Sequence, residues 1–365
     1  MNSFKSQGSF KGELENSLPT VSIIIINYNG RYFLKNCLKS LNEISYPRDK
    51  VEIILVDNAS TDGSVEYVKR NFPQVRVLRL NRNFGFTGGA NRGASIARGE
   101  YLLFLNNDTI VDKNWLLELI TAILTDDRIA ICGSRVLSMR NHSDIGSIGF
   151  LNMVGGALLL PHHKGLEGKM YHFVGSIHGA SILIKKKVFS ELSGFEDDYF
   201  MYSDEVDLCH RAWLYGYYVA YCPRSIVYHY EGGTANTSKI YQRGILCSRL
   251  SSSFRIYYGN RNSMVNMIKN LEFINVVKGL IISGIYFLIQ LSMLLRSSRV
   301  RDIILLLKAY AYPIRHLKST LKKRFFIQRR RRISDHELMS NGLMLSSSSF
   351  IKLIYFLMWR SKYLK

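Results

Sequence analysis

Tyr101–Val111, YLLFLNNDTIV, is the stretch that decides the fold. It opens with the apolar run Tyr101–Leu105, which is bounded by polar residues and is typical of a strand buried on both faces of a parallel sheet. The run ends in Asn106, Asn107 and Asp108. Because ligands of open α/β sheets lie beyond the carboxyl ends of the strands, we expect a carboxylate and two amides at a binding edge. Such groups suit Mg²⁺ or Mn²⁺ held together with a diphosphate; the alternative is a polar turn with a capping Asp.

Three further apolar runs precede this stretch, and each ends in polar residues. They are Val21–Asn27, Val51–Val56 and Val75–Leu80, and Arg31–Leu41 between the first two has the apolar spacing of a helix. The alternation of strands and helices predicts a doubly wound, mostly parallel sheet. Asp57 follows the second run directly. It is therefore placed to accept hydrogen bonds from a nucleobase or a ribose.

Two loops and one histidine are also expected near the binding edge. Asn81–Gly93, NRNFGFTGGANRG, is rich in glycine, which would let backbone N–H groups approach a ligand, and the helix after it would present its positive N-terminus. Arg140–Lys169 has no clear period and is interpreted as an active-site loop. The apolar run Ser225–Tyr228 ends in His229, which can reach the same edge.

A group of carboxylates opens a second informative segment. Asp204, Glu205 and Asp207 lie within four residues at the start of a predicted helix, and Arg211 follows one turn later. Acidic residues favour a helix N-terminus, which explains them without a catalytic role. Their crowding, however, raises the pKa of a carboxylate and suits a general base.

Length and composition indicate one large globular domain with an additional smaller region. The chain has 365 residues, of which 47% are hydrophobic, enough for one large α/β domain and more. Residues 1–20 are polar and predict a loose tail. The cysteines are scattered without CxxC spacing, which favours a reducing compartment and no structural zinc; they are Cys37, Cys132, Cys209, Cys222 and Cys247.

Positive charge is concentrated in the last third of the chain. The formal net charge is +21; residues 1–230 hold 25 Lys/Arg against 23 Asp/Glu, whereas residues 231–365 hold 24 against 5. A module this basic is expected to face an anionic partner. The runs Lys322–Arg324 and Arg329–Arg332 would suit a nucleic-acid-binding protein, but no nucleic-acid motif is visible and long apolar runs separate them, so no nucleic acid is expected.

Apolar runs within this basic region predict membrane association. Gly279–Leu295 is uncharged over 17 residues, the lower limit for a spanning helix. A single span would translocate the Arg cluster against the positive-inside tendency. We therefore expect helices that lie in the cytoplasmic leaflet with Lys and Arg on anionic headgroups; a true span and a buried hairpin are the alternatives. Ile303–Tyr312 and Phe350–Trp359 are further apolar runs.

Six motifs occur in order between Val21 and Gly233: VSIIIINYNG, VDNASTDGS, NRNFGFTGGANRG, FLNND, GFEDDYFMYSDEVDLCHR and VYHYEGG. Together they resemble the family 2 glycosyltransferases of the GT-A fold, in particular the rhamnosyltransferase-like enzymes of cell-surface polysaccharide assembly. The resemblance implies inverting transfer of a sugar, with rhamnose as one candidate, from a nucleotide-sugar to a hydroxyl.

The resemblance also implies roles for particular residues. Glu205 aligns with the catalytic base, with Asp204 as the alternative. Asp108 matches the last acid of the metal-binding DxD motif, whose first acid is Asn106 here, and His229 can complete a site for Mg²⁺ or Mn²⁺. Asp207 and Arg211 would support the site. The residues expected to bind the nucleotide-sugar are Asn27, Asp57, Asn58, Asn91, Asn106, Asn107 and Gly179.

The predicted organisation is a loose tail over 1–20, a catalytic domain over 21–235, and a basic helical, membrane-associated region over 236–365. The acceptor implied is a lipid-linked glycan or oligosaccharide at the cytoplasmic face of a membrane. The enzyme alternative is a sugar nucleotidyltransferase, which shares a similar sheet but usually carries a Gly-rich signature with Arg or Lys near its first strand. Asn27–Phe33, NYNGRYF, is not such a signature.

Overall fold

The computed structural model describes residues 18–166, 168–230, 252–350 and 352. Its main sheet is nine-stranded and confirms the predicted α/β class. The strand order is β3 (Arg76–Arg79), β2 (Val51–Asp57), β1 (Val21–Asn27), β4 (Tyr101–Asn106), β11 (Ser181–Lys185), β6 (Ile129–Ser138), β12 (Tyr218–His229) and β5 (Thr109–Val111), with β9 (His172–Phe173) beside β12.

The sheet is mixed: β12 is parallel to β6 but antiparallel to β5 and β9. β1, β2, β3 and β4 are parallel, whereas β11 runs antiparallel to both β4 and β6. A short apolar run such as Ile182–Ile184 carries no sign of its direction, so the sequence could not reveal this reversal. The reversal brings the start of β11 to the edge where β4 ends, because Ser181 pairs with Leu105.

Helices cover both faces of the sheet. Side chains alternate along β1: Ile23 and Ile25 face one core with α2 (Arg31–Leu41) and α5 (Trp115–Leu124), and Ile24 faces the other core with α4 (Gly85–Ile96) and α7 (Asp204–Leu214). Burial on both faces explains the unbroken β-branched run of this strand. The remaining helices of this part are α3 (Ser64–Asn71) and α6 (Lys186–Glu191).

The interpretation of Arg140–Lys169 as a loop is wrong. This segment contains β7 (Ile148–Leu151) and β8 (Ala157–Leu160), which form a three-stranded antiparallel sheet with β10 (Ser176–Ile177). The hairpin turn is set by Asn152, whose Oδ1 accepts hydrogen bonds from the N–H groups of Val154 and Gly156. A turn of this kind depends on local hydrogen bonds and not on a periodic pattern of apolar residues. The hairpin could therefore not be predicted from hydrophobic periodicity.

The glycine-rich segment also has a different role from the one expected. Gly88, Gly89 and Gly93 lie inside α4 rather than in a loop around a ligand. A Cβ on Gly93 would lie 2.5 Å from Ile24 Cγ2 and 2.8 Å from Val56 Cγ2. Gly93 therefore lets α4 pack closely on β1 and β2.

Gly93→Ala is expected to lower the free energy of unfolding by about 1–3 kcal/mol, because the added methyl overpacks the contact between helix and sheet. Gly284→Ala is the matched control, since nothing lies within 4 Å of a Cβ at that helical position. The control should be neutral or slightly stabilising. Urea unfolding of both variants measures the difference, and equal stabilities would contradict the packing role of Gly93.

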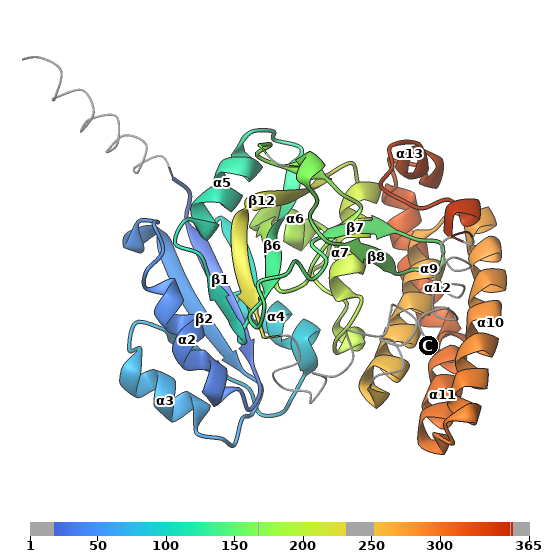
Figure 1. Cartoon of the computed structure of the whole chain (residues 1–365), viewed down its shortest axis with the longest axis horizontal. Coiled ribbons are helices and arrows are strands. Elements are labelled where there is room, and N and C mark those ends of the chain that lie inside the picture. Colours follow the sequence, from blue (N-terminus) through green and yellow to red (C-terminus); the bar gives the residue numbers. More distant parts are fainter. Residues whose placement is uncertain (1–17, 167, 231–251, 351, 353–365) are drawn as a thin grey trace, which may run out of the picture.

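A helical region follows the sheet domain and packs against it on one side (Figure 1). It contains a π-helical turn, η5 (Arg255–Gly259), and the helices α9 (Asn260–Asn270), α10 (Phe273–Arg296), α11 (Val300–Arg315), α12 (Leu317–Arg330) and α13 (Asp335–Ser340). α9 contacts α7 of the sheet domain as well as α10, α11 and α12. The predicted domain boundary at residue 235, and most of the predicted tail, lie outside the described residues.

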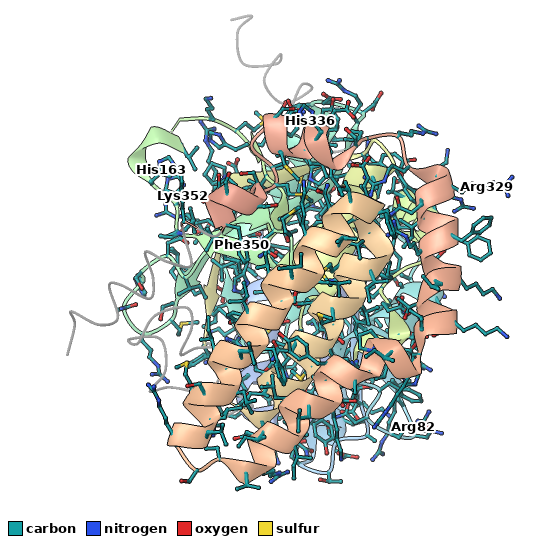
Figure 2. All side chains as sticks on the ribbon, turned by 90° about the vertical axis from the view of Figure 1, so that its right-hand side faces the viewer. Arg82, His163, Arg329, His336, Phe350 and Lys352 are labelled. Atoms are coloured by element: carbon teal, nitrogen blue, oxygen red, sulfur yellow. The ribbon has the colours of Figure 1, made fainter. Side chains whose placement is uncertain are left out.

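Part of the positive charge of this region is used inside the molecule. Lys323 Nζ lies 2.6 Å from a carboxylate oxygen of Glu196, and Arg324 Nη1 donates to the carbonyls of Ile268 and Leu271. The remaining cations on α12 that are exposed to solvent are Lys318, Lys322, Arg329 and Arg330. In Figure 2, Arg329 points away from the body of the molecule. The basic sequence therefore serves both internal contacts and an outward-facing surface.

α10 is the one helix among the described residues that is long and apolar enough to cross a membrane. Its mean hydropathy over the most apolar 18 residues is 1.7, and only 22% of that window is buried. α10 and α11 lie side by side on the outer side of the helical region (Figure 2). The apolar run Phe350–Trp359 lies mostly outside the described residues.

Candidate active site

The ends of three neighbouring strands bring polar side chains together at one edge of the sheet. Asn27 pairs with Asp57 in register, and Asn106 ends the adjacent strand β4. Asn27 Nδ2 donates to Asp57 Oδ1 at 3.3 Å, and Asn107 Nδ2 donates to Asn27 Oδ1 at 2.8 Å. Asp57 Oδ2 accepts from the N–H of Ser60. The structure thus unites the residues that the sequence placed at this edge, with Asp57 buried and bonded through both oxygens.

Two other predicted nucleotide-binding residues make structural hydrogen bonds. Asn58 donates to the carbonyl of Gly85 at 2.9 Å, which ties the end of β2 to the start of α4. Asn91 Nδ2 donates to the Phe195 carbonyl and to Asp197 Oδ1, and its Oδ1 accepts from the Phe195 N–H. The amide of Asn91 therefore links α4 to the segment before α7, and its contact with a nucleotide stays a prediction.

Asp108 and His229 meet at the same edge although 121 residues separate them. The register of β12 on β5 pairs His229 with Thr109, and the Tyr230 N–H donates to the Asp108 carbonyl. His229 Nε2 lies 3.0 Å from Asp108 Oδ1 and 3.3 Å from Asn106 Nδ2. The two predicted metal ligands are thus in direct contact.

The spacing of these two atoms fits a shared cation. Two donor atoms that are each about 2.1 Å from one octahedral cation, at a right angle, lie about 3.0 Å apart. Among the described residues no group of three or more His, Cys, Asp or Glu side chains converges in this way. Asp108 and His229 would therefore hold Mg²⁺ or Mn²⁺ only together with other oxygen ligands, as is usual for cations bound with substrate phosphates.

His178 lies beside this pair and was not selected from the sequence. Its ring centroid is 5.8 Å from that of His229, and its Nδ1 accepts a hydrogen bond from the Ala180 N–H. Burial is the main cause that lowers the pKa of His178 to about 3, with smaller contributions from His229 and Arg255. His178 is therefore neutral at physiological pH. Its proximity depends on the antiparallel direction of β11, which the sequence did not reveal.

Glu205 faces the same edge across Gly179. A Cβ on Gly179 would lie 3.7 Å from Glu205 Oε2, so the backbone at Gly179 borders the carboxylate. Glu205 is half-buried. Burial raises the pKa of Glu205 above its ordinary value, although its own backbone N–H group and Arg255 act in the opposite direction. A half-buried carboxylate with a raised pKa has the properties of a general base.

Asp204 differs from Glu205 in its surroundings. It is buried, with 6% of its surface exposed. Burial, and then the charge of Glu205, raise the pKa of Asp204 well above its ordinary value. Of the two candidate bases, Glu205 is thus the one with solvent access and with a glycine beside its carboxylate.

Asp207 and Arg211 belong to a buried ionic network below the site. Arg211 donates to Asp207 and to the carbonyls of Leu192 and Gly194, and Lys269 Nζ lies 2.9 Å from Asp207 Oδ1. Burial alone would raise the pKa of Asp207, but Arg211 and Lys269 more than offset it and the pKa falls below its usual range. This network fastens α7 to its surroundings, and the supporting role of Asp207 and Arg211 in the reaction stays a prediction.

Comparison with known proteins finds sequence similarity to glycosyltransferases. Residues 22–193 match the family model "Glycosyl transferase family 2". The chain is 25% identical over 253 residues to the low-salt glycan biosynthesis hexosyltransferase Agl10 of Haloferax volcanii, covering 67% of this chain and 74% of Agl10. It is 29% identical over 246 residues to N-acetylgalactosaminyltransferase 6 of Drosophila melanogaster, covering 62% of this chain but 36% of that protein.

One solved structure shares the fold. The crystal structure of GalNAc-T7 with UDP, GalNAc and Mn²⁺ superposes with a TM-score of 0.51 and 21% identity. The superposition covers 58% of this chain and 44% of that chain. This likeness supports the GT-A fold assigned to the sheet domain.

Proposed function

We propose that the protein is an inverting glycosyltransferase of family 2, whose family model residues 22–193 match. In this proposal it moves a hexosyl group, with rhamnose as one candidate, from a nucleoside-diphosphate sugar to a hydroxyl of a lipid-linked or oligosaccharide acceptor. The observation that carries the proposal is the chain of neighbours that runs from Glu205 through Gly179 and His178 to the Asp108–His229 pair. Glu205, Asp108 and His229 come from three distant parts of the chain.

Each group at the edge has a defined task in this proposal. Glu205 removes the proton from the acceptor hydroxyl as that oxygen attacks the anomeric carbon of the donor sugar. Asp108 and His229 would hold Mg²⁺ or Mn²⁺, and such a cation would supply charge neutralisation for the departing diphosphate. Support comes from the related crystal structure, which contains UDP and Mn²⁺. Asn27 and Asp57 shape the edge that receives the nucleotide.

Inversion follows from a single displacement. With Glu205 acting as a base on the acceptor, the attacking oxygen approaches the face of the sugar opposite to the diphosphate. No covalent intermediate with the enzyme is needed, and one displacement inverts the anomeric configuration.

A donor screen tests the function itself. Purified protein would be incubated with UDP-glucose, UDP-GalNAc, GDP-mannose and dTDP-rhamnose in the presence of Mn²⁺, and the nucleotide products would be separated by chromatography. Glycosyl transfer, including transfer to water, releases the nucleoside diphosphate. In a parallel incubation with added pyrophosphate, formation of nucleoside triphosphate and sugar 1-phosphate from the nucleotide-sugar would instead support the nucleotidyltransferase alternative.

We further propose that the helical region docks on the cytoplasmic leaflet of a membrane without crossing it. Exposed apolar residues recur at helical spacing along α10 and α11 and form the apolar face, defined as Ile281, Ile285, Leu288, Ile304 and Leu307. Such a stripe next to exposed cations suits binding in the headgroup region of an anionic bilayer. Docking would hold the active site near a lipid-linked acceptor.

The double variant Ile281→Gln/Ile285→Gln is expected to weaken sedimentation with phosphatidylglycerol vesicles by tenfold or more, because about 1.5–3 kcal/mol of burial is lost per side chain that inserts fully. Both side chains are exposed in the protein, at 63% and 56%, so folding should be unaffected. Leu124→Gln, at a site 51% exposed on α5, is the control. Equal sedimentation of both variants would contradict docking through the apolar face.

A further inference from the structure

The stretch that leads into α7 has an unusual backbone. Residues 197–203, called the approach segment, start with a 3₁₀ turn (Asp197–Tyr199) and end at the N-terminus of the helix that carries Glu205. Phe200, Tyr202 and Ser203 all have positive φ, at 63°, 70° and 59°. Non-glycine residues adopt this conformation at an energetic cost, and it persists only where the surroundings enforce it.

α4 holds the approach segment from one side. The N–H groups of Phe86 and Thr87, at the start of that helix, donate to the Phe200 carbonyl at 2.6 and 3.4 Å. Thr87 Oγ1 donates to the Asp197 carbonyl. The positive N-terminus of α4, which the sequence analysis assigned to a ligand, is therefore occupied by a carbonyl of this protein.

Asn262 of α9 holds the segment from the other side. Its Nδ2 lies 3.1, 2.9 and 2.8 Å from the carbonyl oxygens of Tyr199, Met201 and Tyr202. Its Oδ1 accepts from Arg261 Nε at 2.9 Å, which fixes the orientation of the amide. Asn262 is fully buried, so no water competes for these contacts. The side-chain amide of Asn262 is thus within hydrogen-bond distance of three carbonyl groups of the approach segment.

Neighbouring α9 residues extend this contact to the end of the segment. Asn266 Nδ2 donates to the Ser203 carbonyl at 3.1 Å and to the Gly155 carbonyl at 3.2 Å, and Asn266 Oδ1 accepts from the Tyr199 hydroxyl. Figure 1 shows α9 beside α7, at the junction between the sheet domain and the outer helices. The helical region is therefore attached to the turn that presents Glu205.

We propose that Asn262 is a positioning residue for the reaction: by holding the carbonyls of the approach segment, it fixes the direction in which Glu205 leaves the start of α7. This inference rests on the proposed role of Glu205 as base. Asn262 itself touches neither substrate nor the reacting atoms. It acts through Glu205, because a shift of about 1 Å in a reacting group can lower a rate by about 10²-fold.

The chain contains a matched control in the same helix. Asn260 is also buried, and its amide exchanges hydrogen bonds of 3.0 and 3.1 Å with Gln290 of α10 while its Nδ2 donates to the Ile256 carbonyl. None of these contacts reaches the approach segment. Asn260→Asp and Asn262→Asp both remove a buried amide donor without a change of shape, so the two should lose similar stability.

The test is a double-mutant cycle on nucleoside diphosphate release, using the donor that the screen selects. Asn262→Asp is expected to lower kcat by about 10²-fold with the affinity for the free nucleoside diphosphate unchanged by calorimetry. Asn260→Asp should keep the wild-type kcat. In the Glu205→Gln background, Asn262→Asp should cause no further loss, because the group that it positions no longer acts as a base.

The possible failures are distinguishable. If Glu205→Gln alone keeps full activity, the proposed base is wrong and the proposed function needs another group. If Glu205→Gln is impaired but Asn262→Asp behaves like Asn260→Asp, or if the losses from Asn262→Asp and Glu205→Gln multiply, Asn262 is a structural residue and the inference is overturned while the proposed function stands.

Discussion

Glu205→Gln is expected to lower kcat by about 10²–10⁴-fold, the usual contribution of a positioned general base. Glutamine keeps the shape of the side chain beside Gly179 but cannot accept the proton of the acceptor hydroxyl. Binding of the nucleoside diphosphate should stay at its wild-type value, because the hydrogen bonds among Asn27, Asp57 and Asn107 do not involve Glu205. Steady-state rates and calorimetry measure the two effects separately.

The pH dependence of kcat gives a second expectation for the same residue. A general base works only when ionised, and burial raises the pKa of Glu205 above the ordinary value of 4.5. Activity should therefore be lost as the pH falls through a value above 4.5, and this acidic limb should be absent in Glu205→Gln. If Glu205→Gln is active and Asp204→Asn is inactive, the role of base belongs to Asp204.

Asp108→Asn is expected to reduce kcat/KM by at least about 10²-fold, because a cation contributes several kcal/mol to stabilisation of the leaving group. The variant keeps the shape of Asp108 and its neighbours but removes the only carboxylate of the pair with His229. Binding of Mn²⁺ in the presence of UDP, followed by electron paramagnetic resonance, should weaken in parallel.

The control for this variant is Asp112→Asn, four residues further along. Asp112 accepts a hydrogen bond from the Asn114 N–H at the start of α5 and does not face His229. It should retain wild-type activity and Mn²⁺ binding. Full activity of Asp108→Asn, or of the wild type in excess chelator, would show that the cation is not required.

The binding edge was predictable because it depends on the ends of apolar runs. Val21–Asn27 and Tyr101–Leu105 have strong β patterns, and in parallel strands their last residues fall at one edge. Asn27, Asp57 and Asn106 were found on this basis, and the resemblance to the family added Asp108, His229 and Glu205. The structure brings these residues together at the edge, with Glu205 reaching it across Gly179.

The roles of His178, Asn262 and the α4 glycines could not be predicted, because they depend on tertiary contacts that leave no periodic pattern in the sequence. His178 reaches the site only because β11 runs antiparallel, and the short apolar run Ile182–Ile184 gives no direction. Asn262 acts through hydrogen bonds to carbonyls about 60 residues away. The glycines of α4 were assigned to a ligand, whereas close packing on Ile24 and Val56 explains Gly93. In each case the tertiary arrangement, not a local pattern, decides the role.

The most direct test of the account is the anomeric configuration of the glycoside formed on the acceptor, read by NMR from the one-bond ¹³C–¹H coupling at the anomeric carbon of the transferred sugar. The account predicts inversion relative to the donor, because Glu205 activates the acceptor for a single displacement. It also predicts that residual product from Glu205→Gln is inverted. A product with retained configuration would contradict the account, because retention requires a second displacement or a front-face path that Glu205 does not provide.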